Sequence, residues 1–136
     1  MQRFLLDTNH LSHAVDCESV VAQRILEARL EGHRVGVCLP VLCELEAGSR
    51  FVNRPVEYRR NLDQLLRQLR IWPMDTETTR LYGDLYAELR SKGRALSSVD
   101  IMIAALCRQF DCTLLTADRD FEAVSDVTAE NWLGGP

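Results

Sequence analysis

The stretch "FLLDTN" (residues 4–9) runs three apolar residues directly into a carboxylate. Residues 4–6 predict a short buried strand, and Asp7 lies where that strand ends. A charge at the mouth of a buried strand is costly unless a neighbouring group compensates it. Asp7 is therefore either the N-cap of a helix that begins at Thr8, a role that Asp fills well, or part of a site that requires negative charge.

Strands and helices alternate along the rest of the chain. Helices are predicted by apolar residues at helical spacing, with Pro40 and Pro55 at helix starts and Gly32 at a helix end. Expected strands cover 3–6, 34–39, 71–74, 113–116 and 126–131; expected helices cover 8–15, 19–32, 40–52, 56–70, 76–92 and 98–110, with a short helical turn after 116. This alternation predicts an α/β fold with a mainly parallel central sheet. Ligands bind such sheets outside the carboxyl ends of the strands, where Asp7 and Asp118 are expected.

The chain of 136 residues has the length of one domain, and its 46% hydrophobic and 26% charged residues are typical of soluble globular proteins. We predict a single domain over residues 1–133 and a loose tail over 134–136. Neither a signal peptide nor an apolar run of the ~20 residues that span a bilayer is evident. We therefore expect a cytoplasmic protein without membrane contact. The net charge of −4 gives the surface no general attraction for a polyanion.

The cysteines and histidines do not predict a zinc site. The five cysteines are odd in number, include no C-x-x-C pair and mostly have apolar neighbours, so buried free thiols are expected rather than disulfides. His10 and His13 have the spacing of a helical H-x-x-H pair, which can touch a metal. Because no third or fourth ligand is evident, we interpret this pair as surface residues.

Two glutamates in the expected helix over 40–52 differ in their surroundings. Glu46 has Arg50 four residues further on, which is a favourable surface pair. Glu44 lies at the border of the apolar helix face, and Gly48, one turn later, leaves space for something to approach. Glu44 is therefore either an edge residue whose carboxylate reaches water or part of a functional site.

Asp7, Asp100 and Asp118 each have an ordinary explanation as helix caps or first-turn acids. The predicted sheet nevertheless brings all three, together with Glu44, toward one edge. Carboxylates packed together repel one another, and a divalent cation would remove that conflict. Because the candidate ligands are all oxygen atoms, we predict Mg²⁺ or Mn²⁺, which can activate water and stabilise charge on a phosphoryl oxygen. The pattern indicates metal-dependent hydrolysis of phosphodiesters.

The segments that contain these four acids resemble the acidic motifs of PIN-domain ribonucleases, in particular VapC-type toxins of bacterial toxin–antitoxin pairs. In family order they are "LLDTN" (5–9), "ELEAG" (44–48), "SSVDIMIAA" (97–105) and "LLTADRDF" (114–121). The resemblance implies a three-layer α/β/α sandwich around a parallel sheet, and Mg²⁺- or Mn²⁺-dependent cleavage of RNA by an endoribonuclease. It also implies a homodimer and a cognate antitoxin whose segment covers the pocket.

The same resemblance implies roles for individual residues. It places the catalytic, metal-binding acids at Asp7, Glu44, Asp100 and Asp118, and polar residues that support these acids at Thr8, Asn9 and Thr116. The fourth motif reads T-x-D-x-D-F, one residue shorter than the commoner family form. Asp120 is therefore an alternative to Asp118 as the fourth acid.

An RNA substrate must meet positive charge near this acidic pocket. Arginine provides all the basic side chains except Lys92, and arginine suits bidentate contacts with phosphate. Arg90 and Arg94, just before the third acid, are candidate RNA-binding residues, with solvated helix surface as the alternative.

Two other functions remain open from sequence. One is a receiver-like Mg²⁺-binding phosphoacceptor domain, which would need paired acids after the first strand and a lysine at the end of a late strand. Here the first strand is followed by one aspartate, and Lys92 lies between a helix and a loop. The other is a PIN-like binding module without catalytic activity, which the presence of all four acids disfavours.

Overall fold

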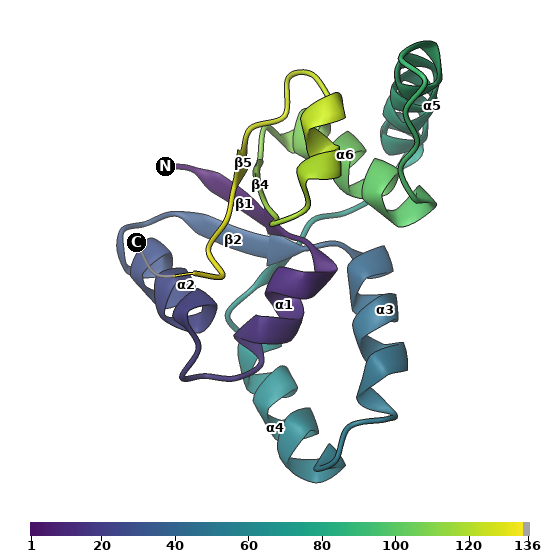
Figure 1. Ribbon diagram of the computed structural model, residues 1–136. Helices are drawn as coiled ribbons and strands as arrows, with labels where there is room; N and C mark the ends of the chain where they lie inside the picture. Colours follow the sequence, from purple (N-terminus) through teal and green to yellow (C-terminus); the bar gives the residue numbers. More distant parts are fainter. Residues whose placement is uncertain (135–136) are drawn as a thin grey trace.

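The computed structural model describes residues 1–134 and contains the predicted alternation of strands and helices (Figure 1). The strands are β1 (Arg3–Leu6), β2 (Arg34–Val37), β3 (Arg70–Ile71), β4 (Thr113–Leu115) and β5 (Ala129–Glu130). The helices are α1 (Thr8–Ala14), α2 (Val20–Leu30), α3 (Leu39–Ser49), α4 (Pro55–Leu66), α5 (Thr76–Ser91) and α6 (Ser98–Phe110), with the 3₁₀ helix η1 (Arg119–Ala123). Of the predicted tail, 135–136 lies outside the described residues, and the domain limit at 133 stays a prediction.

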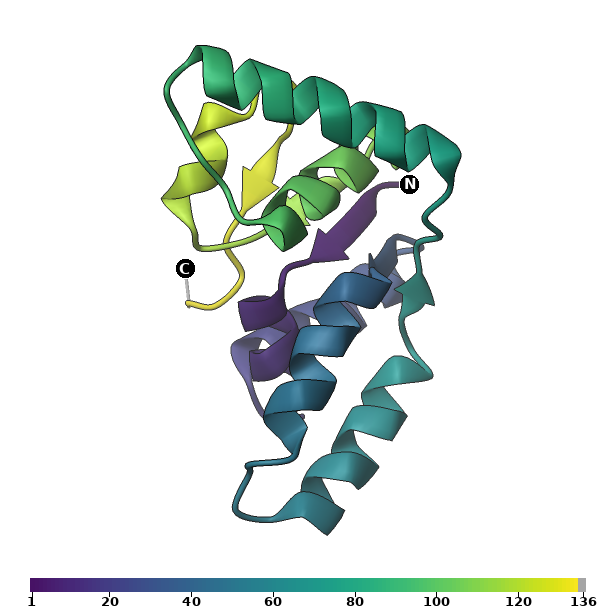
Figure 2. The same ribbon diagram turned by 90° about the vertical axis from the view of Figure 1, so that its right-hand side faces the viewer.

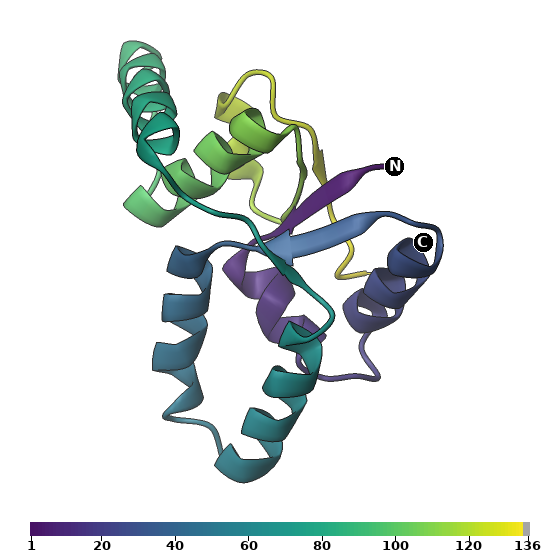
Figure 3. The same cartoon turned by 180° about the vertical axis from the view of Figure 1, so that it is seen from behind.

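All five strands form one sheet in the order β3-β2-β1-β4-β5, and every neighbouring pair is parallel. Helix α6 packs on one side of the sheet with α5 outside it, and α1 and α2 lie on the other side (Figures 1 and 3). The predicted three-layer α/β/α arrangement is confirmed. Since Leu6 of β1 pairs with Leu115 of β4, the carboxyl ends of these two strands lie side by side. No helix within residues 1–134 is both long and apolar enough to cross a membrane.

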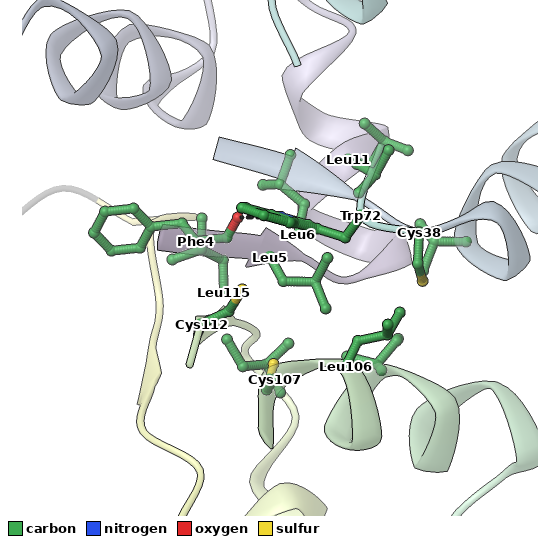
Figure 4. Close-up of a cluster of buried hydrophobic side chains, with 14 of the residues drawn as sticks. Phe4, Leu5, Leu6, Leu11, Cys38, Trp72, Leu106, Cys107, Cys112 and Leu115 are labelled. Atoms are coloured by element: carbon green, nitrogen blue, oxygen red, sulfur yellow. Dashed lines mark hydrogen bonds between the residues drawn. The ribbon is translucent and has the colours of Figure 1, made fainter. Parts of the chain in front are cut away.

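Strand β1 is buried on both faces, which explains its unbroken apolar run. Its residues Phe4, Leu5 and Leu6 are each at most 3% exposed. Figure 4 shows the Leu5 side chain directed toward Leu106 and Cys107 of α6. Successive side chains alternate between the two faces of a strand. Phe4 and Leu6 therefore point to the other face of the sheet, on the side of α1 and α2. A core that holds β1 from both sides also fixes the residue that follows it, Asp7.

Helices α3 and α4 form a hairpin that projects away from the sheet (Figure 2). Arg59 of α4 donates hydrogen bonds to the Glu46 carboxylate of α3, and Arg50 pairs with the same carboxylate at 3.2 Å. These bonds, chiefly that from Arg59, lower the pKa of Glu46. The predicted pairing of Glu46 with Arg50 is confirmed, and the second arginine ties the two helices together.

Replacement of Gly36 by alanine is expected to lower the free energy of unfolding by about 1–3 kcal/mol, as overpacking does. A methyl group at this position of β2 would lie 2.5 Å from the Arg70 backbone oxygen and 2.7 Å from the indole nitrogen of Trp72. Neither can move freely, because Arg70 is paired in the sheet and Trp72 donates to the Phe4 carbonyl oxygen at 3.4 Å. Urea denaturation measures the change.

Gly83→Ala in α5 is the matched control for Gly36→Ala. Among residues 1–134, no atom beyond the chain neighbours and the backbone of its own helix lies within 4 Å of a methyl group added at this position. Because alanine forms helices better than glycine, the control is expected to gain about 0.5–1 kcal/mol of stability. Similar losses in both variants would contradict the packing argument.

Candidate active site

A cavity of about 460 Å³ contains all four candidate acids. Its walls come from the junction of β1 with α1, from α3, from the start of α6 and from the segment after β4, and Figure 2 shows α6 beginning beside the end of β1. The lining residues are Asp7, Thr8, Asn9, Glu44, Ser97, Asp100, Ala117, Asp118 and Phe121. The parallel sheet thus brings together acids that are far apart in the sequence.

Asp7 is the most buried of these acids, with 7% of the residue exposed. It caps α1, because its Oδ1 accepts the backbone N–H of His10 at 2.8 Å and also lies 3.1 Å from the His10 ring Nδ1. Burial alone would raise the pKa of Asp7, but hydrogen bonds from His10 and Thr116 hold that pKa below its usual value. The carboxylate is therefore kept ionised inside the protein.

Glu44 reaches the cavity from α3, and its residue is exposed. Its Oε1 accepts a hydrogen bond from the Thr8 hydroxyl of α1 at 2.5 Å. One turn further along α3, no atom of residues 1–134 beyond the chain neighbours and the helix's own backbone lies within 4 Å of a methyl group added to Gly48, as the predicted open space requires. The contact with Thr8 therefore holds the Glu44 carboxylate at the cavity that Asp7 also lines.

Asp100 lies half-buried in the first turn of α6. Ser97 caps this helix by accepting the backbone N–H of Asp100 at 3.1 Å. Burial raises the pKa of Asp100, and a hydrogen bond from Ser97 opposes this effect. The negative charges of the other three acids, Asp118, Glu44 and Asp7, raise the pKa further. The four carboxylates therefore act on one another electrostatically.

Asp118 follows β4 and caps η1, with its Oδ1 accepting the backbone N–H of Asp120 at 2.9 Å. The buried Thr116 hydroxyl accepts the backbone N–H of Asp118 at 3.0 Å. Asp118 lines the cavity, whereas Asp120 is not among the lining residues. The geometry favours Asp118 over Asp120 as the fourth acid.

The four carboxylates surround the cavity without forming a finished ligand cage. Within residues 1–134, no three His, Cys, Asp or Glu side chains are grouped so that they could hold a metal ion as they lie. In the same part of the chain, no arginine or lysine forms an ion pair with any of the four acids. Mutually repelling oxygen donors that pair with no arginine or lysine in these residues suit a hard divalent cation, toward which flexible carboxylates can turn.

The two histidines of the H-x-x-H pair have different surroundings. His13 is exposed as predicted, but His10 is completely buried, so its interpretation as a surface residue is wrong. His10 lies on the inner face of α1 with Leu11, and its ring contacts Asp7 and the backbone of Trp132. Neither histidine lines the cavity.

The five cysteines are free, as predicted. Cys38, Cys107 and Cys112 are buried as predicted, but Cys17 and Cys43 are exposed, so the prediction of buried thiols is wrong for these two. Burial raises the pKa of all three buried thiols, that of Cys112 to about 12. These three side chains are therefore packing groups rather than reactive thiolates.

The candidate RNA-binding residues Arg90 and Arg94 are exposed at the end of α5 and in the loop that follows. That loop ends at Ser97, which lines the cavity. Sequence reasoning missed Phe121 as a wall of the cavity, although an aromatic residue directly after an acidic motif was a usable signal. Phe121 is 4% exposed, so it closes the cavity wall as part of the core, whereas the two arginines lie at the surface.

Comparison with known proteins finds one family and several relatives that match almost the whole chain. The PIN domain family matches residues 4–127. Ribonuclease VapC2 of Rickettsia felis is 27% identical over 130 residues, which cover 95% of this chain and 97% of that protein. Ribonuclease VapC2 of Haemophilus influenzae is 27% identical over 138 residues, which cover 98% of this chain and 100% of that protein.

Solved structures show the same fold. In the crystal structure of VapBC2 from Rickettsia felis bound to a DNA fragment from their promoter, the similar chain has a TM-score of 0.86 and 26% identity, over 96% of this chain and 99% of that one. In DNA-bound VapBC from Salmonella typhimurium the TM-score is 0.83 at 24% identity, over 97% of this chain and 99% of that one. At this second level of identity the likeness concerns the fold alone.

Proposed function

Because this chain belongs to the PIN domain family, we propose that it is a divalent-metal-dependent endoribonuclease and the toxin of a toxin–antitoxin pair. The observation that carries the proposal is the cavity whose four acids form no ion pair with an arginine or lysine within residues 1–134. Relatives that match nearly the whole chain are named ribonucleases, which supports RNA as the substrate. Membership of this family also argues against a receiver-like phosphoacceptor domain.

Asp7, Asp100 and Asp118 would hold Mg²⁺ or Mn²⁺ through their carboxylate oxygens. When bound, such an ion lowers the pKa of water and neutralises charge on the scissile phosphate. Glu44 would either complete the ligand set or orient the attacking water as a hydrogen-bond acceptor. Its exposed position and its contact with Thr8 are compatible with both roles.

The hydroxyl and amide side chains around the acids would hold the carboxylates in place. Thr8 binds the Glu44 carboxylate directly, and Thr116 contacts the backbone of Asp118. Asn9 lines the same cavity with its residue exposed, so we propose that it helps to orient the acids or the substrate. Such outer contacts keep metal ligands at defined positions and tune their affinity.

The proposed protein partner is an antitoxin that covers the acidic cavity. The solved relative from Rickettsia felis is a VapBC2 complex bound to promoter DNA, and a similar assembly would keep this chain inactive until it is released. We propose further that the chain forms a homodimer and acts in the cytoplasm.

Removal of divalent ions is expected to abolish RNA cleavage. The purified chain, free of any antitoxin, is treated with EDTA, dialysed and incubated with labelled structured RNA. Because the proposed ligands are all oxygen atoms, activity should return with Mg²⁺ or Mn²⁺. Undiminished cleavage in EDTA would contradict the metal-dependent mechanism. RNA binding without cleavage at every metal concentration would instead identify a non-catalytic binding module.

The double variant with alanine at Arg90 and Arg94 is expected to bind RNA more weakly at low salt. Each lost phosphate contact should lower the slope of log K against log salt by about 0.7–0.9. Arg80→Ala is the control, because Arg80 is an exposed arginine of the same helix that is paired with Glu77. If the double variant and the control had the same salt dependence, these two arginines would not be RNA contacts.

A further inference from the structure

His10 is a fully buried imidazole with a partner at each ring nitrogen. Its Nδ1 lies 3.1 Å from Asp7 Oδ1, and its Nε2 accepts the backbone N–H of Trp132 at 3.0 Å. The side chain has 0% exposure, so water does not compete for either contact. Two satisfied ring nitrogens fix both the position and the orientation of the ring.

The contact with Trp132 also determines which ring nitrogen carries the proton. A backbone N–H can only donate, so Nε2 must accept through its lone pair. The ring proton therefore lies on Nδ1, from which it is donated to Asp7 Oδ1. This assignment follows from the direction of one backbone hydrogen bond, because the tautomer of a histidine is set by the bond that its other nitrogen makes.

Trp132 is itself held firmly, so that its backbone N–H is a fixed donor. The residue is 3% exposed, and its ring lies 4.9 Å from that of Phe4 between centroids. The Arg24 guanidinium lies 4.8 Å from the indole centroid, on which it stacks as a cation. The indole N–H donates to the Glu130 carboxylate at 3.1 Å. These contacts hold the Trp132 backbone in place beside the His10 ring.

We propose that His10 is a positioning residue for Asp7, which it holds between α1 and the Trp132 backbone so that one carboxylate oxygen is aimed at the metal site. Asp7 Oδ1 receives two donors from His10, the backbone N–H and the ring Nδ1–H, which leaves Oδ2 as the oxygen free of His10. The inference rests on the proposed function, since it requires a metal site. It adds a residue outside the four acids and connects the C-terminal segment of the chain to that site.

Two substitutions separate positioning from simple stability. His10→Leu keeps a side chain of similar size but removes both ring contacts, whereas His10→Asn retains an N–H that can donate to Asp7. Loss of an outer partner of a metal ligand lowers metal affinity about 10–100-fold. His10→Leu should therefore bind Mn²⁺ about 10–100-fold more weakly in an EPR titration, and His10→Asn should recover most of that affinity.

Thr78→Val controls for destabilisation. Thr78 is 1% exposed in α5, where its hydroxyl hydrogen-bonds to Gln109, and it does not line the acidic cavity. This variant should lose thermal stability, as His10→Leu does, but keep the Mn²⁺ affinity of the wild type. Unchanged affinity in His10→Leu, equal losses in the Leu and Asn variants, or an equal loss in Thr78→Val would each overturn the positioning role.

A second measurement does not depend on metal. In ¹⁵N NMR spectra of the metal-free wild type, the His10 ring should show a protonated Nδ1 and an unprotonated Nε2. A proton on Nε2 would overturn the inference, because that tautomer can neither accept from Trp132 nor donate to Asp7. The tautomer and the order of Mn²⁺ affinities are read without RNA, so a failure of the proposed ribonuclease activity is recognised separately by the absence of cleavage.

Discussion

The Asp7→Asn variant is expected to lose more than about 100-fold in RNA cleavage while it keeps its fold. Even an outer partner of a metal ligand contributes about 10–100-fold, and Asp7 is proposed to be a ligand itself. The lowered pKa of Asp7 means that the wild-type side chain is charged at neutral pH, so the substitution removes a full negative charge. Asn caps helices about as well as Asp, and its oxygen can still accept the backbone N–H of His10. Single-turnover cleavage of a labelled RNA at saturating Mn²⁺ gives the rate, and thermal denaturation reports on the fold.

The matched control for this experiment is Asp120→Asn, and Asp118→Asn is the companion test in the same motif. Asp120→Asn makes the same chemical change at an exposed acid that does not line the cavity, and it should leave the rate close to that of the wild type. Asp118→Asn should lose activity as Asp7→Asn does. The reverse order of these two variants would make Asp120 the fourth acid. A wild-type rate for Asp7→Asn in metal-saturated buffer would mean that Asp7 is not part of the site.

Helix capping and the proposed metal binding are compatible roles for an aspartate at the end of a strand. Asp7 and Asp118 each use Oδ1 to cap the helix that follows. A carboxylate has two oxygens with several lone pairs, so one oxygen can satisfy the helix N-terminus while the other remains available to a cation. Asp100 does not cap its helix, because the Ser97 hydroxyl caps α6 by accepting the backbone N–H of Asp100. The sequence alternatives of cap or site therefore do not exclude each other.

The fold and the convergence of the four candidate acids on one cavity were predictable because both follow from local sequence patterns. The apolar run of β1 and the prolines at the starts of α3 and α4 define the elements, and parallel βαβ topology places Asp7 and Asp118 at the same edge. Contacts between distant segments were not predictable in this way. His10 was misread because its partner Trp132 is 122 residues away. The strand expected over 126–131 was also predicted too long: β5 covers only Ala129–Glu130, because its partner β4 is itself three residues long.

Glu44→Gln is expected to lower RNA cleavage by at least about 100-fold, the range typical of a lost acid–base or water-orienting group. Gln keeps an oxygen that can accept the hydrogen bond from Thr8, so the side chain should stay in place and stability should change little. The two proposed roles then give different results. If Glu44 is a ligand, Mn²⁺ affinity falls together with the rate; if it orients water, the rate falls while the affinity is retained.

Glu46→Gln makes the same change two residues away and should leave RNA cleavage at the wild-type rate. Glu46 lies in α3, where its carboxylate pairs with Arg50 and with Arg59 of α4, and its side chain is partly exposed. Its replacement should cost less than about 1 kcal/mol of stability, as partly exposed ion pairs do, and leave cleavage unchanged. Equal losses of activity in both variants would show that α3 is merely sensitive to lost charge. Loss at Glu44 alone would show that the site needs a carboxylate at that position of the helix, because the charge removed and the helix are the same in both variants.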